Sequence, residues 1–216
     1  MGPWGSGKSS ACVMKIYMRG VAQKAAADKV RRTRWAIVRN TYQQLTDTTI
    51  KTFHHWLPPS VFGEWRPSEH RYILRAGMED DTRYEIECLF RALDRPDHIR
   101  NLLSLELTGA WVNEARELPW TIIQAMLGRI DRYPPKISGG ATWAGIMLDT
   151  NPPDDESWLF QKFENEKPKG WELFRQPSGL SKKAENRNNL PKNYYERLMS
   201  DLDEDAARAA CEDGHG

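Results

Sequence analysis

The chain has 216 residues, of which 39% are hydrophobic, enough for one sizeable domain with a buried core. A charged fraction of 28% and the lack of any apolar run near ~18 residues predict a protein that does not span a membrane. The net charge of +1 does not indicate a nucleic-acid partner, and three widely spaced cysteines predict a reduced, cytosolic compartment with neither disulfides nor structural zinc.

A glycine-rich loop opens the chain. Residues 2–9 read GPWGSGKS and satisfy the P-loop pattern G-x-x-x-x-G-K-[ST] in full. Glycines let successive backbone N–H groups turn toward a phosphate, and the positive end of the following helix adds to the attraction. That helix is predicted from Ser9 to about Asp28, with apolar residues on one face. The pattern predicts a nucleotide phosphate site at the start of the chain.

The P-loop residues have separate predicted roles. Lys8 supplies a point charge to the β- and γ-phosphates of ATP, and the Ser9 hydroxyl is a hard oxygen ligand for Mg²⁺, so ATP and Mg²⁺ are the expected cofactors. The competing interpretation is an accidental match in a glycine-rich loop. The predicted nucleotide-binding residues are Gly2, Gly5, Ser6, Gly7, Lys8, Ser9 and Ser10.

Basic residues gather early in the chain. Residues 1–40 contain nine Lys or Arg residues and one acid, Asp28, whereas acids dominate the last seventeen residues. Two interpretations of the basic stretch stay open: it faces the phosphates of a nucleic acid, or it is an ordinary solvated surface.

Strands and helices alternate along the next hundred residues. Residues 35–40 (WAIVRN) predict a buried parallel strand, and a helix capped by Asn40 or Thr41 is expected to end at Trp56, before two prolines. Further elements are predicted in this order: a strand pair at 71–76 and 82–90, a helix near 96–103, a strand at 110–113, a helix at 119–130 and a strand at 144–148. This alternation predicts an α/β fold with a mostly parallel sheet flanked by helices.

A P-loop enzyme also needs residues that hold Mg²⁺ and prepare the attacking water. The candidates lie at the C-terminal end of the strand at 110–113, where ligands bind in open α/β sheets. Glu114 is predicted to be the general base that orients water toward the γ-phosphate. Asn113 stands where an Asp usually contacts the metal, and it is predicted as a weak metal contact, direct or through water, because an amide brings no negative charge. The alternative for Glu114 is a solvated residue at a strand end.

The strand at 144–148 leads into Asp149, Thr150, Asn151 and two prolines. Polar residues at a strand end beside a nucleotide can sense the γ-phosphate, but a proline pair also simply ends a strand. The residues alone leave both interpretations open.

Taken together, these motifs resemble the ATPase part of the large terminase subunit of tailed bacteriophages, the motor that packages genomic DNA into a procapsid. The resemblance extends from about residue 2 to residue 198, with the motifs in the family's order. Besides the P-loop, the segments that carry it are WAIVRNTYQQLTDTT, LELTGAWVNEARELP, GRIDRYP, LDTNPP and AENRNNLPKNYYERL.

The resemblance implies a P-loop NTPase fold and several residue roles. Lys8 and Ser9 would bind phosphate and Mg²⁺, and Glu114 would act in catalysis. Thr150 and Asn151 would couple hydrolysis to movement.

The resemblance also implies a motor that works as a homo-oligomeric ring. Its partners would be double-stranded DNA, the portal protein and the terminase small subunit, in the host cytoplasm at the procapsid and away from any membrane. Arg100 is the first candidate for an arginine finger that reaches a neighbouring nucleotide, and Arg129 and Arg132 are its competitors.

The chain departs from the family's pattern in three ways. Asn113 replaces the usual Asp, the strand that normally precedes the P-loop is missing, and no nuclease domain follows. We therefore expect an N-terminally incomplete ATPase domain over residues 1–178 and a helical linker or lid over residues 179–216, toward an absent nuclease domain. DNA cleavage is not expected, because no clustered carboxylates for two metal ions are seen.

Two other functions compete with the packaging motor. One is a helicase-like P-loop ATPase that acts on another nucleic acid. The other is a non-catalytic fragment that binds nucleotide or an assembly partner without turnover, which the missing strand and Asn113 both favour.

Overall fold

The computed structural model describes residues 1–93, 96–202, 207 and 211. These residues form two compact units, one made of residues 1–8 and 149–216 and the other of residues 9–148. No helix in the described part of the chain has the length and apolar character needed to cross a membrane. The predicted division at residue 178 stays a prediction.

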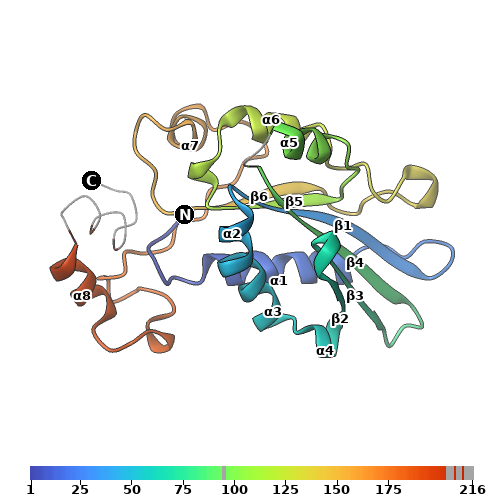
Figure 1. Ribbon diagram of the computed structural model, residues 1–216, viewed down its shortest axis with the longest axis horizontal. Coiled ribbons are helices and arrows are strands. Elements are labelled where there is room, and N and C mark those ends of the chain that lie inside the picture. The colour runs from blue at the N-terminus through green and yellow to red at the C-terminus, as the bar shows by residue number, and fades with distance from the viewer. Residues whose placement is uncertain (94–95, 203–206, 208–210, 212–216) are drawn as a thin grey trace. The chain divides into compact units, whose positions relative to one another are not determined.

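The larger unit is built on a six-stranded sheet with the order β2-β3-β4-β1-β5-β6 (Figure 1). β1 runs parallel to both of its neighbours, β4 and β5, whereas β3 runs antiparallel to β2 and β4. The sheet is therefore mixed, with the predicted strand pair forming an antiparallel side. The strands are β1 (Val30–Arg39), β2 (Gly63–Arg66), β3 (Arg71–Gly77), β4 (Arg83–Ala92), β5 (Gly109–Asn113) and β6 (Gly145–Asp149).

β1 forms the centre of this sheet because its apolar run is buried on both faces. Trp35, Ala36, Ile37 and Val38 are all fully buried, as the continuous apolar sequence predicted. The strand begins at Val30, five residues earlier than expected, because the arginines of its first half find acidic partners.

Helices cover both faces of the sheet (Figure 1). α1 (Lys8–Val21), α3 (Lys51–Trp56) and α4 (Pro59–Phe62) lie on one face, and α5 (Pro96–Leu103) and α6 (Trp120–Leu127) lie on the other. α1 approaches the sheet closely at Gly20, where a Cβ atom would lie 2.2 Å from Ile86 Cδ1.

The prediction that the first helix extends to Asp28 is wrong beyond Val21. Gln23 is almost fully buried just after the helix. Its side chain donates to the carbonyl of Gly140 (2.9 Å) and accepts from the backbone of Thr142 (2.9 Å). These tertiary bonds hold the chain away from the helical path.

The predicted helix ending at Trp56 is confirmed, with a distortion in its middle. Thr41 caps α2 (Tyr42–Gln44) by accepting from the backbone of Gln44 at 3.2 Å, and a π-helical turn over Leu45–Ile50 connects α2 to α3. Such turns occur often at functional sites, and this one carries Thr49.

The described residues of the smaller unit form mainly loops. Its helices are α7 (Trp158–Phe160), a π-helical turn over Gln161–Glu166 and α8 (Tyr194–Asp201). The prediction of a mainly helical chain from residue 178 is wrong before α8, where only a 3-10 turn over Arg187–Asn189 forms. Before that region, the backbone of residues 174–176 bonds to the N-terminus: Met1 donates to the Phe174 carbonyl and accepts from the Gln176 N–H.

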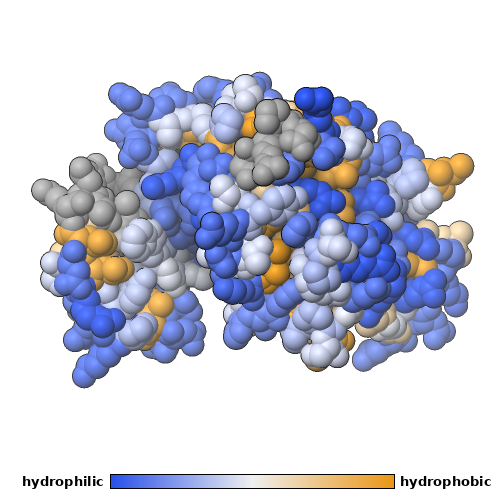
Figure 2. Space-filling model, in the orientation of Figure 1, coloured by the Kyte–Doolittle hydropathy of each residue, from blue (hydrophilic) through white to orange (hydrophobic). Residues whose placement is uncertain are grey.

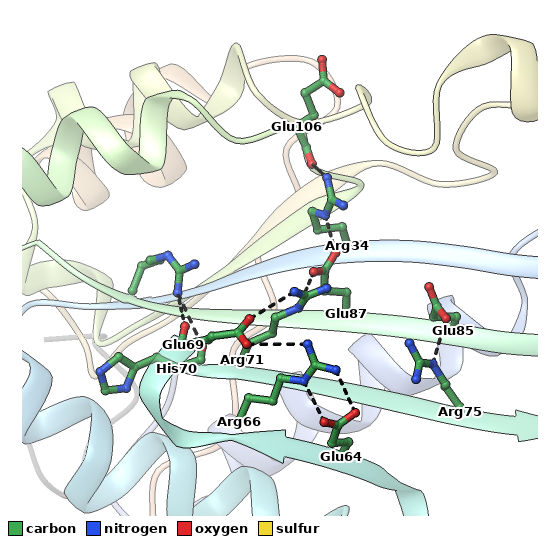
Figure 3. Close-up of polar contacts among 11 residues, drawn as sticks. Arg34, Glu64, Arg66, Glu69, His70, Arg71, Arg75, Glu85, Glu87 and Glu106 are labelled. Atoms are coloured by element: carbon green, nitrogen blue, oxygen red, sulfur yellow. Dashed lines mark hydrogen bonds and ion pairs between the residues drawn. The ribbon is translucent and has the colours of Figure 1, made fainter.

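Charged pairs cross one face of the sheet from β1 to β2 (Figure 3). Glu87 on β4 is paired with Arg34 and, at 2.6 Å, with Arg71, which also reaches Glu69 at 3.2 Å. Arg31 and Arg32 pair with other acids, Asp80 and Asp28. Arg31, Arg32 and Arg34 of β1 are thus paired with acids of the protein, which favours the structural interpretation of these residues of the basic stretch over the phosphate-binding one.

The face drawn in Figure 2 is mostly hydrophilic, and the hydrophobic residues on it form separate patches. The most exposed large hydrophobic side chains of the described residues include Val61, Ile137 and Phe174.

Candidate functional site

The P-loop turns sharply before α1. Gly5 and Gly7 have φ angles of 70° and 85°, in the left-handed region that glycine enters without steric cost. Gly2 lies so close to Gln176 that a Cβ atom would come within 2.5 Å of its Oε1 atom. The glycines of the motif are therefore required by the shape of the loop.

Two side chains of the smaller unit hold the loop. Gln176 donates through Nε2 to the Ser6 carbonyl (2.8 Å), and its Oε1 lies 2.6 Å from the Ser6 hydroxyl. Asn186 donates to the Gly5 carbonyl at 2.6 Å. These bonds fix backbone carbonyls and so help to set the directions of the neighbouring N–H groups.

The Lys8 ammonium group bonds to the loop itself. It donates to the carbonyls of Gly2 and Pro3, each at 2.8 Å, and to Asn151 Oδ1 at 3.0 Å. Lys8 and Asn151, predicted separately from the P-loop and the strand end, are thus in direct contact. The Thr150 hydroxyl beside them is buried and has no hydrogen-bond partner among the described residues.

In the larger unit, Asn113 at the end of β5 is the centre of a polar cluster. Its Oδ1 accepts from Arg39 Nη1 (2.6 Å) and from the Thr49 hydroxyl (2.7 Å), and its Nδ2 donates to the Ser9 hydroxyl (3.3 Å). Arg39 also lies 3.5 Å from the carboxylate of Glu117. Asn113 is only 3% exposed, so this cluster is largely closed to water.

The contacts of Asn113 determine which way its amide points. Arg39 has donors only, so the reverse orientation would set the amide NH₂ against the guanidinium. In the observed orientation the oxygen already accepts two bonds, one of them from a cation. Asn113 therefore does not fit the predicted role of a direct metal ligand. Ser9 fits that role, because a hydroxyl oxygen has two lone pairs and can accept from the amide while it coordinates an ion.

Glu114 directly follows β5 and has a φ angle of 54°, a left-handed conformation that is uncommon and costly for a residue with a side chain. Backbone strain of this kind gathers at functional sites. The residue is partly exposed, and its carbonyl accepts from the Glu117 N–H at 3.0 Å, which closes a tight turn. The turn changes the chain direction at the position predicted for the catalytic base.

The candidate arginine fingers lie in different surroundings. Arg100 is exposed on α5. Arg129 is partly buried, its Nε has no hydrogen-bond partner among the described residues, and its carbonyl accepts from the Leu107 N–H at 3.0 Å. Arg132 is exposed and donates from its backbone to Leu107. Arg129 and Arg132 are therefore near the start of β5, away from the strand end that carries Asn113, and all three assignments stay predictions.

No cluster of three or more His, Cys, Asp or Glu residues suited to a metal ion is found in the described part of the chain.

Comparison with known proteins identifies the fold. No protein-family model and no curated protein sequence matches the chain. The large terminase of a thermophilic bacteriophage, in one crystal form, matches 96% of the chain with a TM-score of 0.68 at 11% sequence identity. The chain therefore shares the fold of part of this large terminase. The predicted P-loop NTPase fold class is therefore confirmed.

The same terminase also matches in its nucleotide complexes. The TM-score is 0.66 at 12% identity for the ADP complex and 0.62 at 11% identity for the ATP-γ-S complex. These two matches cover 97% and 96% of the present chain but only 46% and 44% of the terminase. The chain thus spans less than half the length of the terminase structures that it matches.

Several residues around Asn113, and several around the P-loop, were not predicted from the sequence. They are Arg39, Thr49 and Glu117 around Asn113, and Gln176 and Asn186 around the P-loop. Arg39 meets Asn113 only through the sheet register, which places Val38 of β1 opposite Val112 of β5. No local signal indicated any of these residues.

Proposed function

We propose that this chain is the ATPase motor part of a viral large terminase, which couples ATP hydrolysis to the translocation of double-stranded DNA into a procapsid. The main support for this proposal is the P-loop, with its two left-handed glycines and Lys8 at the start of α1, within a terminase fold. The solved relatives of this fold include ADP and ATP-γ-S complexes, which supports nucleotide binding.

In this proposal the loop N–H groups and Lys8 bind the phosphates, and the Ser9 hydroxyl contributes one oxygen to Mg²⁺ that enters with ATP. The metal, when bound, neutralises phosphate charge. Glu114 accepts a proton from the attacking water, since the residue is partly exposed and begins a strained turn at a strand end. Electrostatic stabilisation by preorganised donors would supply most of the catalysis.

The partners of the motor are also part of the proposal. They are double-stranded DNA, the portal protein, the terminase small subunit and further copies of the chain in a ring, in the host cytoplasm at the procapsid. DNA would be gripped through its phosphates because the motor must move every sequence, so DNA binding should weaken steeply with salt. Arg100, or else Arg129 or Arg132, would reach a neighbouring subunit's nucleotide.

Replacement of Lys8 tests the nucleotide site. The Lys8→Ala variant is expected to lose affinity for a fluorescent ADP analogue by ~100-fold, because it loses a charge that pairs with phosphate. Lys15→Ala is the matched control, since Lys15 is an exposed lysine on the same helix. Equal affinity in both variants would refute the proposed site.

Replacement of Glu114 tests turnover. Mg²⁺-dependent ATP hydrolysis should fall by ~10²–10⁴-fold in Glu114→Gln, the range typical for a general base, while nucleotide affinity stays within a few fold. One observation favours a second function: Asn113, bonded to Arg39, replaces the expected carboxylate. A parent chain that binds nucleotide but shows no turnover, even with DNA, would establish that non-catalytic function.

A further inference from the structure

The polar cluster at the end of β5 contains a cation of the protein's own. Arg39 is 12% exposed in its side chain and donates to Asn113 Oδ1 at 2.6 Å. Resting on the proposed function, we propose that Arg39 fixes the side-chain amide of Asn113 and that this amide positions the Ser9 hydroxyl. The end of β5 then contributes no metal ligand.

Three contacts make Asn113 a link between the strand end and Ser9. Arg39 and Thr49 both donate to the amide oxygen, at 2.6 and 2.7 Å, and the amide nitrogen donates to Ser9 at 3.3 Å. Ser9 accepts this bond with one of the two lone pairs of its hydroxyl oxygen, and such an oxygen can coordinate an ion through the other. The amide thereby sets the orientation of the Ser9 hydroxyl.

Charge excludes a divalent cation from the Asn113 oxygen. A magnesium ion bound there would lie ~2.1 Å from the oxygen, and therefore no more than about 5 Å from Arg39 Nη1. The repulsion between these charges is strong in a site that is nearly closed to water. Glu117 offsets only part of the arginine charge, since it is partly exposed and 3.5 Å away.

This arrangement predicts that restoring the expected carboxylate at position 113 does not by itself restore a metal ligand. In Asn113→Asp, the new carboxylate would pair with Arg39, because that guanidinium already touches the side-chain oxygen at this position. The buried Nε of Arg39, which has no hydrogen-bond partner among the described residues, offers a further donor. A carboxylate alone therefore would not create a metal ligand, whereas a carboxylate without Arg39 would.

The test compares Asn113→Asp, Arg39→Gln and the double variant by binding of a fluorescent ADP analogue over a range of Mg²⁺ concentrations. We expect the Mg²⁺ midpoint of Asn113→Asp to stay within ~2-fold of the parent and that of the double variant to fall by ~10-fold or more. Thr49→Val combined with Asn113→Asp is the matched control, because it removes the other donor to this oxygen but keeps the cation. Its midpoint should stay near that of the parent, and an equal fall in all three variants that carry the Asn113→Asp substitution would overturn the inference.

A second measurement needs neither metal nor nucleotide. In thermal unfolding in chelating buffer, Arg39 should stabilise the Asn113→Asp variant. The Tm of the double variant should therefore lie ~3 °C or more below the Tm expected from the sum of the two single changes. Arg39→Met also removes the charge but keeps an unbranched side chain, so it replaces Arg39→Gln if the latter does not fold, and it should show the same coupling. Normal nucleotide binding without coupling would refute the inference alone, whereas coupling in a chain that binds no nucleotide would refute only the proposed function.

Discussion

Glu87 should carry more of the stability of the sheet than its neighbour of the same type, Glu85. Both lie on the same face of β4, two residues apart, and both pair with arginine (Figure 3). The Glu87 side chain is 10% exposed and contacts two arginines, whereas the Glu85 side chain is 34% exposed and contacts only Arg75 among the described residues. Burial and partner number, not residue type, therefore distinguish the two positions.

The expected loss of unfolding free energy follows from the groups that each substitution leaves without a partner. Glu87→Gln leaves two guanidinium groups facing each other across a neutral side chain. Removing one partner of a fully buried pair costs about 3–5 kcal/mol, and the partial exposure of both arginines reduces the expected loss to about 2–3 kcal/mol. Glu85→Gln breaks an exposed pair and should cost about 0–1 kcal/mol.

Thermal and urea unfolding measure the difference. For a chain of this length we expect Glu87→Gln to lower Tm by about 4–12 °C and Glu85→Gln by no more than about 4 °C. High salt should reduce the effect at Glu85 and leave most of the effect at Glu87, since buried pairs are screened less. Equal losses of stability in the two variants, or disappearance of the Glu87 effect in high salt, would show that all the ion pairs on this face behave as solvent-screened surface pairs.

Three further predictions test packing, protonation and the support of the P-loop. Gly20→Ala should destabilise the fold by about 1–3 kcal/mol because its methyl group meets Ile86, and in urea unfolding the loss in Gly20→Ala/Ile86→Ala should be smaller than the sum of the single losses. Burial lowers the pKa of His54 below 6.5, so the unfolded chain binds more protons at this residue than the folded chain does. The folded state therefore loses stability as the pH falls below 6.5. His54→Phe should reduce that slope of unfolding free energy against pH, and an unchanged slope would contradict the assignment. Gln176→Leu removes two contacts to Ser6 and should weaken binding of a fluorescent ADP analogue roughly 5- to 100-fold, with unchanged affinity as the contrary result.

Features fixed by neighbouring residues could be predicted from the sequence. The P-loop is a contiguous motif, and the buried run of β1 and the alternating strands β3 and β4 follow from local hydrophobic patterns. The proline pair marked the end of the helix at Trp56 in the same way. These predictions needed no knowledge of distant contacts.

Features fixed by distant partners could not be predicted. The end of α1 at Val21 depends on the bonds of Gln23 to residues more than a hundred positions away. The surroundings of Asn113 depend on sheet register, which places β1 beside β5 with Val38 opposite Val112. Local composition contains neither fact, so the sequence named Asn113 but not the arginine that controls its chemistry.

The position of Lys8 gives the coupling residues a physical role within the proposed function. The ammonium group donates to two loop carbonyls and to Asn151 Oδ1. A phosphate competes for this ammonium group, because a charge-assisted bond to phosphate is stronger than a bond to a neutral oxygen. Occupation of the loop would then release the Asn151 amide, next to the buried hydroxyl of Thr150, which lacks a partner among the described residues. A buried polar group without a partner costs free energy. A rearrangement of Thr150 and Asn151 would therefore be favoured when the phosphate binds and again when it leaves. Within the proposed function, an exchange of partners at Lys8 would therefore connect the phosphate site to the chain that follows β6.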